Sequence, residues 1–394
     1  MPRLPIYLDN NATTQVDPRV LEAMLPYFTE VFGNAASIGH SFGINARRAV
    51  EQSRAKIAKC LNATGPIEIV FTSGATESDN LAIKGVAEML AHKGNHIVTS
   101  KTEHKAVLDS CKHLEKTGFE VTYLDVNEDG LIDIDLLENT LTDKTILVTI
   151  MAGNNEIGVL QDLSGIGALC RSRGILFHSD ATQAIGKVPF DVRALNVDLA
   201  SFTAHKIYGP KGAGGLYVRH GAGIKLIAQM DGGGHENGHR SGTLNVPGIV
   251  GLAKCLEICL EDQELELAKL TSLRLRLLNG LKANIAGVHV NGHENLRLPG
   301  HLSISIEGVN GEVLMMQMPE IAVSSVSACS SGSGATSHVI SALGHDEDRA
   351  LSTLRFGIGR FNTQDEIDYV ISRITDLVLK MRNQPASSTT SSKK

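Results

Sequence analysis

The fold is indicated most clearly by residues 174–218, GILFHSDATQAIGKVPFDVRALNVDLASFTAHKIYGPKGAGGLYV. Short apolar runs alternate there with helix-like patterns, and the same alternation extends from about residue 65 to residue 220. Repetition of strand and helix predicts a mostly parallel sheet with helices on both faces. The predicted strands are IEIVF (67–71), HIVT (96–99), VTYL (121–124), TILVT (145–149), ILFH (175–178), LASFT (199–203) and GLYV (215–218).

The pattern changes beyond residue 245. A Leu- and Glu-rich stretch at about 252–284 predicts one long helical segment, and the runs at 301–308 and 321–325 predict new strands. The last helix is expected to begin at the capping box Thr363–Glu366. We therefore expect an α/β protein with a seven-stranded, mostly parallel sheet domain and a smaller α+β domain. The expected bounds are 15–255 for the large domain, 1–14 and 256–384 for the small domain, and 385–394 for a disordered tail.

Composition excludes several classes of protein. The chain has 394 residues, is 42% hydrophobic and carries a formal net charge of -6, so no positive field favours binding to nucleic acid. The amino-terminal residues lack the pattern of a secretory or transit signal, and no run of about 18 apolar residues predicts a membrane span. The six cysteines include no C-x-x-C pair, which favours a reducing compartment. We expect a cytoplasmic protein without a direct nucleic-acid or membrane partner.

Two patterns resemble metal sites but are not expected to bind metal. The calcium-loop-like segment that begins at Asp125 has Leu136 where a bidentate glutamate is required. The sequence HENGH (235–239) matches a zinc-protease pattern, but the glycines around it oppose the helix that this mechanism needs. Cys255 and Cys259 are more simply explained as buried apolar side chains.

Three other features together predict one ligand. The segment 72–80, TSGATESDN, is a glycine-containing turn from strand to helix, where free N–H groups and the helix dipole favour a phosphate. Asp180 stands at the carboxyl end of a buried strand, where ligands bind in open α/β sheets. Lys206 follows another strand end, where burial favours a neutral, nucleophilic amine. An anion site, a carboxylate and a nucleophilic lysine are what pyridoxal phosphate requires.

The motifs around these residues resemble those of the cysteine desulfurases of the NifS/IscS type, within the class V aminotransferases. The similarity extends from YLDNNATT (7–14) to LRFGIGRF (354–361) and implies the pyridoxal phosphate-dependent transferase fold of type I. The most specific matching motifs are TSGATESDN (72–80), TEH (102–104), GNNEIG (153–158), HSDATQAIGKVPFD (178–191), AHKIYGPKG (204–212), RSGTLN (240–245) and SACSSGS (327–333).

The resemblance implies a role for each matching residue. Lys206 would bind the cofactor covalently and carry protons, and His104 would stack on the cofactor ring and exchange protons. Asp180 would face the pyridine nitrogen, and Gln183 the phenolate oxygen. The remaining implied contacts are Ala75, Thr76, Thr203 and His205 with the phosphate, Thr243 with the phosphate of the neighbouring subunit in a homodimer, Asn155 beside the ring and near the substrate, and Arg355 and Asn11 with the substrate, Arg355 pairing with its carboxylate.

Cys329 is the implied nucleophile. It lies among small polar residues with little to bury, and we expect an exposed, mobile loop there, more flexible than is usual in the family because of the run from Ser333 to Ser337. In the implied reaction free L-cysteine displaces Lys206 from the cofactor, and the Cys329 thiolate attacks the substrate sulfur. L-Alanine leaves and a persulfide remains on Cys329.

The sequence leaves several alternatives open. A selenocysteine lyase or an aminotransferase would share this fold and cofactor, and a non-catalytic partner in sulfur transfer is a third possibility. The resemblance implies a sulfur acceptor, such as an iron-sulfur scaffold or a protein of transfer-RNA thiolation, without identifying it.

Overall fold

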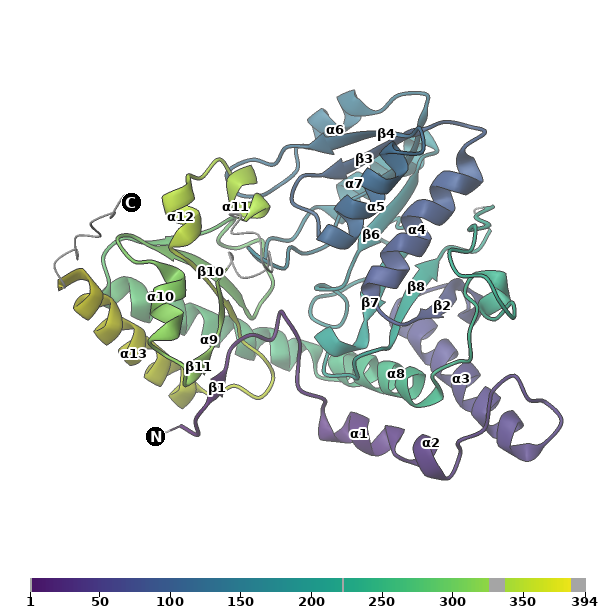
Figure 1. Ribbon diagram of the computed structural model, residues 1–394, viewed down its shortest axis with the longest axis horizontal. Coiled ribbons are helices and arrows are strands. Elements are labelled where there is room, and N and C mark those ends of the chain that lie inside the picture. Colours follow the sequence, from purple (N-terminus) through teal and green to yellow (C-terminus); the bar gives the residue numbers. More distant parts are fainter. Residues whose placement is uncertain (1, 222, 326–336, 384–394) are drawn as a thin grey trace, which may run out of the picture.

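The computed structural model describes residues 2–221, 223–325 and 337–383. Cys329, the predicted flexible loop around it and the predicted disordered tail lie outside these residues. The described part forms a larger body around a seven-stranded sheet and a smaller body at one side of it (Figure 1). No helix within the described ranges is both long and apolar enough to span a membrane.

The large sheet is mostly parallel, as predicted. Only β8 is antiparallel to its neighbours among the paired strands, and each predicted strand is found within a few residues of its expected position. The strand order is β2 (Ile69–Thr72), β8 (Gly214–Val218), β7 (Leu199–Thr203), β6 (Leu176–Asp180), β5 (Thr145–Thr149), β3 (His96–Ser100) and β4 (Glu120–Leu124).

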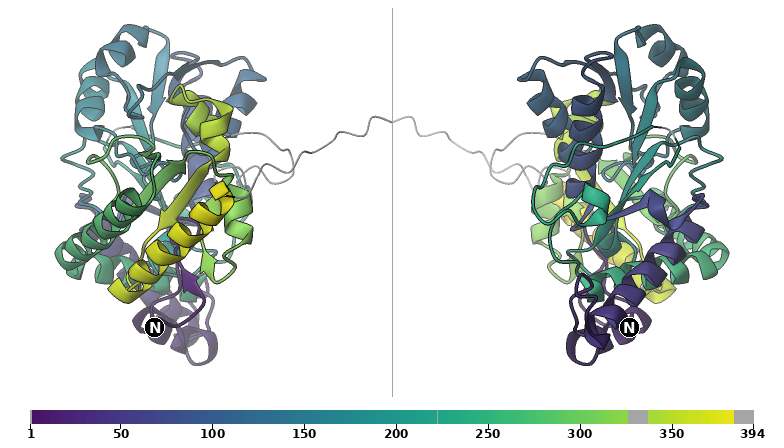
Figure 2. Two further views of the ribbon diagram at one scale, coloured as in Figure 1. Left: turned by 90° about the vertical axis from the view of Figure 1, so that its left-hand side faces the viewer. Right: turned by 90° about the vertical axis from the view of Figure 1, so that its right-hand side faces the viewer.

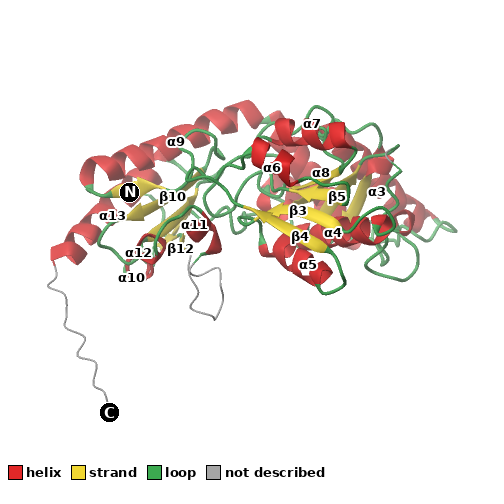
Figure 3. Ribbon diagram, turned by 90° about the horizontal axis from the view of Figure 1, so that it is seen from above, coloured by secondary structure: helices red, strands yellow, loops and turns green. Residues whose placement is uncertain are grey.

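Helices cover both faces of this sheet, because each strand buries side chains on both sides (Figure 3). One apolar cluster joins the sheet to α4 (Ala75–Leu90) and α5 (Lys105–Glu115). The opposite face packs against helices from the start, the middle and the end of the large body's sequence. These are α1 (Pro18–Met24), α3 (Ser41–Cys60), α6 (Ile134–Thr140), α7 (Leu163–Arg173) and α8 (Val246–Glu261), with the short α2 (Pro26–Thr29) beside them.

The small body has its own apolar core. An antiparallel sheet of order β12-β13-β10-β9 and the parallel pair β1-β11 pack against two long helices, α9 (Gln263–Asn284) and α13 (Gln364–Asn383), which lie side by side (Figure 2). The remaining elements here are β1 (Ile6–Tyr7), β9 (Val288–Val290), β10 (His301–Ile306), α10 (Gly311–Met316), β11 (Ile321–Ala322), β12 (Ser324–Ser325), α11 (His338–Ala342), α12 (Glu347–Leu351) and β13 (Thr353–Gly357).

Two predictions about the small body were wrong in detail. The helical stretch at 252–284 is two helices, because Asp262 leaves helical geometry (φ -94°, ψ 1°) and ends α8 before α9 begins. No glycine or proline marks this break. The strand expected at 321–325 is divided into β11 and β12, which pair with different partners. The capping box is confirmed, since Thr363 Oγ1 accepts from Glu366 N and the Glu366 carboxylate accepts from Thr363 N.

Candidate active site

The predicted site residues gather at the carboxyl end of the parallel strands. Loops that follow β2, β3, β5, β6 and β7 surround a cavity of about 630 Å³. Residues 11–13, near the start of the chain, also line it. Arg355 reaches the same cavity from β13 of the small body. The cavity therefore lies where parallel α/β sheets bind ligands, at a junction of the two bodies.

The anion end of the cavity is the start of α4. The N–H groups in the first turn of a helix have no intrahelical acceptor. The N-cap of α4 is Gly74, in extended geometry, which has no side chain to accept from these N–H groups. Ala75 and Thr76 line the cavity there. Gly214 lets β8 lie close to Gly74 at the start of α4, because a Cβ atom on Gly214 would lie 2.6 Å from Gly74 Cα. The arrangement can hold a phosphate without a phosphate-binding lysine motif.

Two further predicted phosphate residues follow β7. Thr203 Oγ1 donates to Ala213 O at 3.1 Å, and His205 Nδ1 lies 3.2 Å from Thr13 Oγ1. Burial, with the positive charge of Lys206 next, lowers the pKa of His205 to about 4. His205 is therefore a neutral hydrogen-bonding group at neutral pH and not a cation.

Lys206 is placed by a single 3-10 turn, Ala204–Lys206, directly after β7. Its Nζ donates to Asn11 O at 2.7 Å and to Ala12 O at 2.6 Å. These two carbonyl groups hold the amine at the cavity wall. Asn11, which the resemblance implied as a substrate contact, thus also contacts the lysine through its backbone carbonyl group.

Asp180 and Gln183 lie on neighbouring parts of the cavity. Asp180 is the last residue of β6 and its Oδ1 accepts from Thr182 N at 3.0 Å, which fixes the carboxylate. Gln183 donates through Nε2 to Asn11 O at 2.9 Å and accepts through Oε1 from Asn11 Nδ2 at 3.1 Å. The carboxylate and the amide can thus face different edges of one flat ligand.

His104 is the N-cap of α5. Its Nδ1 accepts from Ala106 N at 3.1 Å, so a neutral imidazole carries its proton on Nε2. The side chain is exposed and lines the cavity. His104 can therefore hold or deliver a proton at Nε2.

Arg355 is buried and already engaged by protein groups. Its guanidinium donates to Asn155 O at 3.0 Å, to Asp9 Oδ1 at 2.9 Å and to Ser324 Oγ at 3.0 Å. Its Nε has no hydrogen-bond partner within the described ranges. The ion pair with Asp9 was not expected from the sequence, and it fixes the orientation of the guanidinium.

A group of buried acids lies behind Asp180. Burial and the nearby charge of Asp180 raise the pKa of Asp79 well above its usual value, and burial has the same effect on Glu103. His178 Nε2 is 3.7 Å from Asp79 Oδ1, but burial lowers the pKa of His178 to about 3. Burial therefore opposes the charged form of both partners.

Two predicted residues are not in this cavity. Thr243 is exposed and does not line it, and Cys329 lies outside the described residues. Residues that the sequence analysis missed also belong to the site, including Thr13, Thr182 and Lys211. Small polar residues and lysines are common in surface turns, so only the place of these three residues in the folded chain identifies them.

The residues fit pyridoxal phosphate. An open cavity, a helix terminus without a side-chain cap, a fixed carboxylate and a lysine amine meet in one place. Within the described part of the chain no cluster of His, Cys, Asp and Glu has the geometry of a metal site. The donor set is thus that of a phosphate-bearing, carbonyl-containing cofactor.

Comparison with known proteins agrees with this geometry. A family model described as Aminotransferase class-V matches residues 6–370. Cysteine desulfurase IscS of Anaeromyxobacter dehalogenans (strain 2CP-C) is 54% identical over 380 residues, which cover 96% of this chain and 94% of that protein. A solved NifS-like protein has a TM-score of 0.89 and 39% identity, covering 95% of this chain and 100% of the other. SspA, solved in complex with cysteine, has a TM-score of 0.80 and 35% identity, covering 91% and 100%.

Proposed function

Because the chain belongs to the class-V aminotransferase family, we infer that it is a pyridoxal phosphate-dependent cysteine desulfurase. The observation that carries this function is the convergence of Lys206, Asp180 and the amino-terminal end of α4 on one cavity. The protein acts on L-cysteine, releases L-alanine and passes the sulfur to an acceptor.

We propose that the cofactor is held by the residues that line the cavity. The first turn of α4, with Thr76, would bind the phosphate together with Thr203 and His205, and Asp180 would face the ring nitrogen. Lys206 would bind the cofactor covalently. Bound in this way, pyridoxal phosphate supplies an electron sink for bonds at the substrate carbon atoms.

The protein groups would then move protons and orient the substrate. Lys206 Nζ and His104 Nε2, which both lie at the cavity wall, would carry protons. The buried guanidinium of Arg355, which also donates to Asn155 O, would pair with the substrate carboxylate, and Asn155 would lie near the substrate. Asp9 holds that guanidinium in place, so Arg355 is preorganised before substrate arrives.

The sulfur step is proposed to occur on Cys329. The carbon–sulfur bond of the substrate breaks, its sulfur joins the Cys329 sulfur as a persulfide, and the carbon gains a proton to become the methyl group of L-alanine. Atoms and electrons balance without an outside oxidant. Each of the five described cysteines is a free thiol, four of them buried, and burial raises the pKa of each. They are therefore poor candidates for this nucleophile.

Mass spectrometry of the protein, with and without L-cysteine, tests this function. We expect a mass increase of one sulfur atom on the peptide that contains Cys329. Cys329→Ser should abolish sulfide release, while Cys60→Ser, which alters the one half-buried described thiol, should not. Alanine formation by Cys329→Ser at the wild-type rate would instead favour a selenocysteine lyase, and formation of a 2-oxo acid without alanine would favour an aminotransferase.

A homodimer is part of the proposal. Thr243 is exposed and does not line the cavity of its own chain, which suits a contact with the phosphate in a second subunit. Mixing Thr243→Ala with Lys206→Ala subunits tests this idea. A hybrid dimer would contain one intact site and regain activity if Thr243 acts across the interface. Activity that does not recover on mixing would contradict the contact.

We also propose a cytoplasmic location, since the described cysteines are free and the chemistry needs a reduced thiol. The acceptor would be a protein such as an iron-sulfur scaffold or a carrier for transfer-RNA thiolation. Transfer of labelled sulfur from the persulfide to each purified acceptor would discriminate between them.

A further inference from the structure

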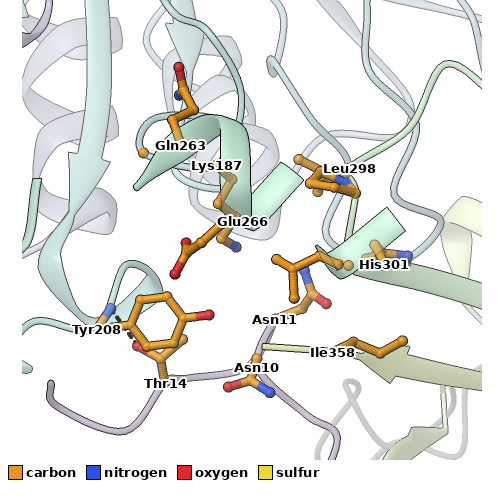
Figure 4. Close-up of a pocket in the computed structure, with 14 residues that line it drawn as sticks. Asn10, Asn11, Thr14, Lys187, Tyr208, Gln263, Glu266, Leu298, His301 and Ile358 are labelled. Atoms are coloured by element: carbon orange, nitrogen blue, oxygen red, sulfur yellow. Dashed lines mark hydrogen bonds between the residues drawn. The ribbon is translucent and has the colours of Figure 1, made fainter. Parts of the chain in front are cut away.

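A second, smaller cavity lies beside the site and shares Asn11 with it. Its volume is about 30 Å³, and residues of both bodies line it (Figure 4). Lys187 points into this cavity and does not line the cofactor cavity. This lysine has no role in the proposed mechanism.

The hydrogen bond of Lys187 leads directly to the cofactor cavity. Its Nζ donates to Gln183 Oε1 at 2.6 Å, and this is the one acceptor of the amine within the described residues. Gln183 Oε1 also accepts from Asn11 Nδ2 at 3.1 Å. Both lone pairs of this oxygen are therefore used, so the oxygen end of the amide is fixed and Nε2 remains the donor end.

The O and N positions of the Gln183 amide follow from its partners. Asn11 O only accepts, so the Gln183 atom that lies 2.9 Å from it is Nε2, and Oε1 then faces the Lys187 amine, which can donate with or without its extra proton. The same Asn11 O accepts from Lys206 Nζ at 2.7 Å. Lys187, Gln183, Asn11 and Lys206 thus form one continuous hydrogen-bonded chain that ends at the cofactor lysine.

The amine of Lys187 has no carboxylate partner in the described ranges. Glu266 lines the same cavity, but its carboxylate is bound by Arg360. Burial, and then the positive charges of Lys206 and Arg355, lower the pKa of Lys187 to about 7, against the opposing effect of the Cys259 thiol. A lysine in such surroundings is costly, which indicates that its bond to Gln183 has a function.

We propose that Lys187 is a positioning residue for the cofactor site, which holds the Gln183 amide so that Nε2 is presented as a donor to the phenolate oxygen of pyridoxal phosphate. This inference rests on the proposed function. Lys187 acts through Gln183 and does not touch the cofactor. Loss of its hydrogen bond frees the amide to rotate and weakens the donor at the phenolate oxygen.

The pH dependence of the visible absorption band of the holoenzyme tests this inference. A donor at the phenolate oxygen stabilises its negative charge most when the nitrogen that joins the cofactor to Lys206 is unprotonated. Without that donor the nitrogen should hold its proton to higher pH. Lys187→Met should therefore raise the pH at which the absorption band is half converted by about half a unit or more. The dissociation constant of the cofactor should rise about threefold to tenfold. Lys187→Arg, which keeps a donor, should recover most of both changes.

A double-mutant cycle separates this role from a general effect on charge or folding. Gln183→Leu should shift the midpoint in the same direction, and adding Lys187→Met to it should cause no further shift. Additive shifts, a midpoint that does not change in Lys187→Met, or an equally large shift in Lys187→Arg would overturn the inference. A wild-type protein that shows no such band would instead contradict the proposed function itself.

Discussion

At the scale of single residues, burial raises the pKa values of the acids behind the site. Asp79 is fully buried, and burial and the charge of Asp180 raise its pKa well above 3.8. A carboxyl group with a raised pKa in the folded state contributes stability below its unfolded pKa and loses that contribution as pH rises through the folded value.

Asp79→Asn should therefore stabilise the protein at neutral and alkaline pH. The gain should be on the order of 1–3 kcal/mol near pH 8 and close to zero near pH 4, because the amide has no charge to suppress. Thermal unfolding at both pH values measures it. Asp143→Asn, at an exposed position, is the control and should change neither midpoint. A gain of equal size at both pH values would contradict the raised pKa.

Glu236 is a second residue whose environment decides its role. It belongs to the HENGH segment, where it forms a short 3-10 turn and accepts from Arg54 through two bonds of 2.7 Å. Phe71 N donates to the same carboxylate at 2.7 Å. The glutamate therefore anchors the loop that leads to Thr243.

Glu236→Ala should destabilise the protein by about 3–5 kcal/mol, since it removes the buried carboxylate partner of the Arg54 guanidinium and leaves only the exposed Glu51. Glu51→Ala is the matched control, because Glu51 also pairs with Arg54 but is 54% exposed, and its loss should be about 1 kcal/mol or less. Thermal unfolding of both variants provides the comparison. Equal losses would show that burial does not determine the strength of this pair.

At the scale of elements, the cofactor site depends on the approach of β8 to the start of α4. A Cβ atom at Gly214 would lie 2.6 Å from Gly74 Cα and 2.8 Å from Phe202 O, and both are backbone atoms that cannot rotate away.

Gly214→Ala should lower the free energy of unfolding by about 1–3 kcal/mol and weaken cofactor binding, because β8 and the first turn of α4 must move apart. Gly65→Ala, where a Cβ meets no neighbour within 4 Å, should have neither effect. Cofactor titration and thermal unfolding measure both; unchanged cofactor affinity in Gly214→Ala would contradict the argument.

At the scale of the whole molecule, large apolar side chains are exposed around α2 and the start of α3. Phe28, Phe32 and Ile38 are 57%, 63% and 66% exposed, and the rings of Phe32 and Phe42 are 5.3 Å apart. Exposed apolar groups that gather in one region favour a protein interface, in line with the proposed homodimer.

Phe32→Asp should therefore convert a dimer into a monomer and reduce cofactor retention, since the Thr243 contact would be lost with the interface. Light scattering after size-exclusion chromatography measures the mass. Leu265→Asp, at a residue of α9 that is 77% exposed, is the control and should remain dimeric. A dimeric Phe32→Asp would place the interface elsewhere.

The sequence by itself determined the sheet, its order of strand and helix, and the residues of the site that carry distinctive chemistry. Apolar periodicity is local, and Lys206, Asp180 and the turn 72–80 stand at strand ends that a parallel sheet must bring to one edge. The tertiary structure alone decided the break at Asp262, the Asp9–Arg355 pair and the chain from Lys187 to Gln183. The Asp9–Arg355 pair joins segments far apart in sequence, the surroundings of Lys187 depend on burial that lowers its pKa, and the break at Asp262 is marked by no glycine or proline. Contacts and burial of this kind exist only once the chain has folded.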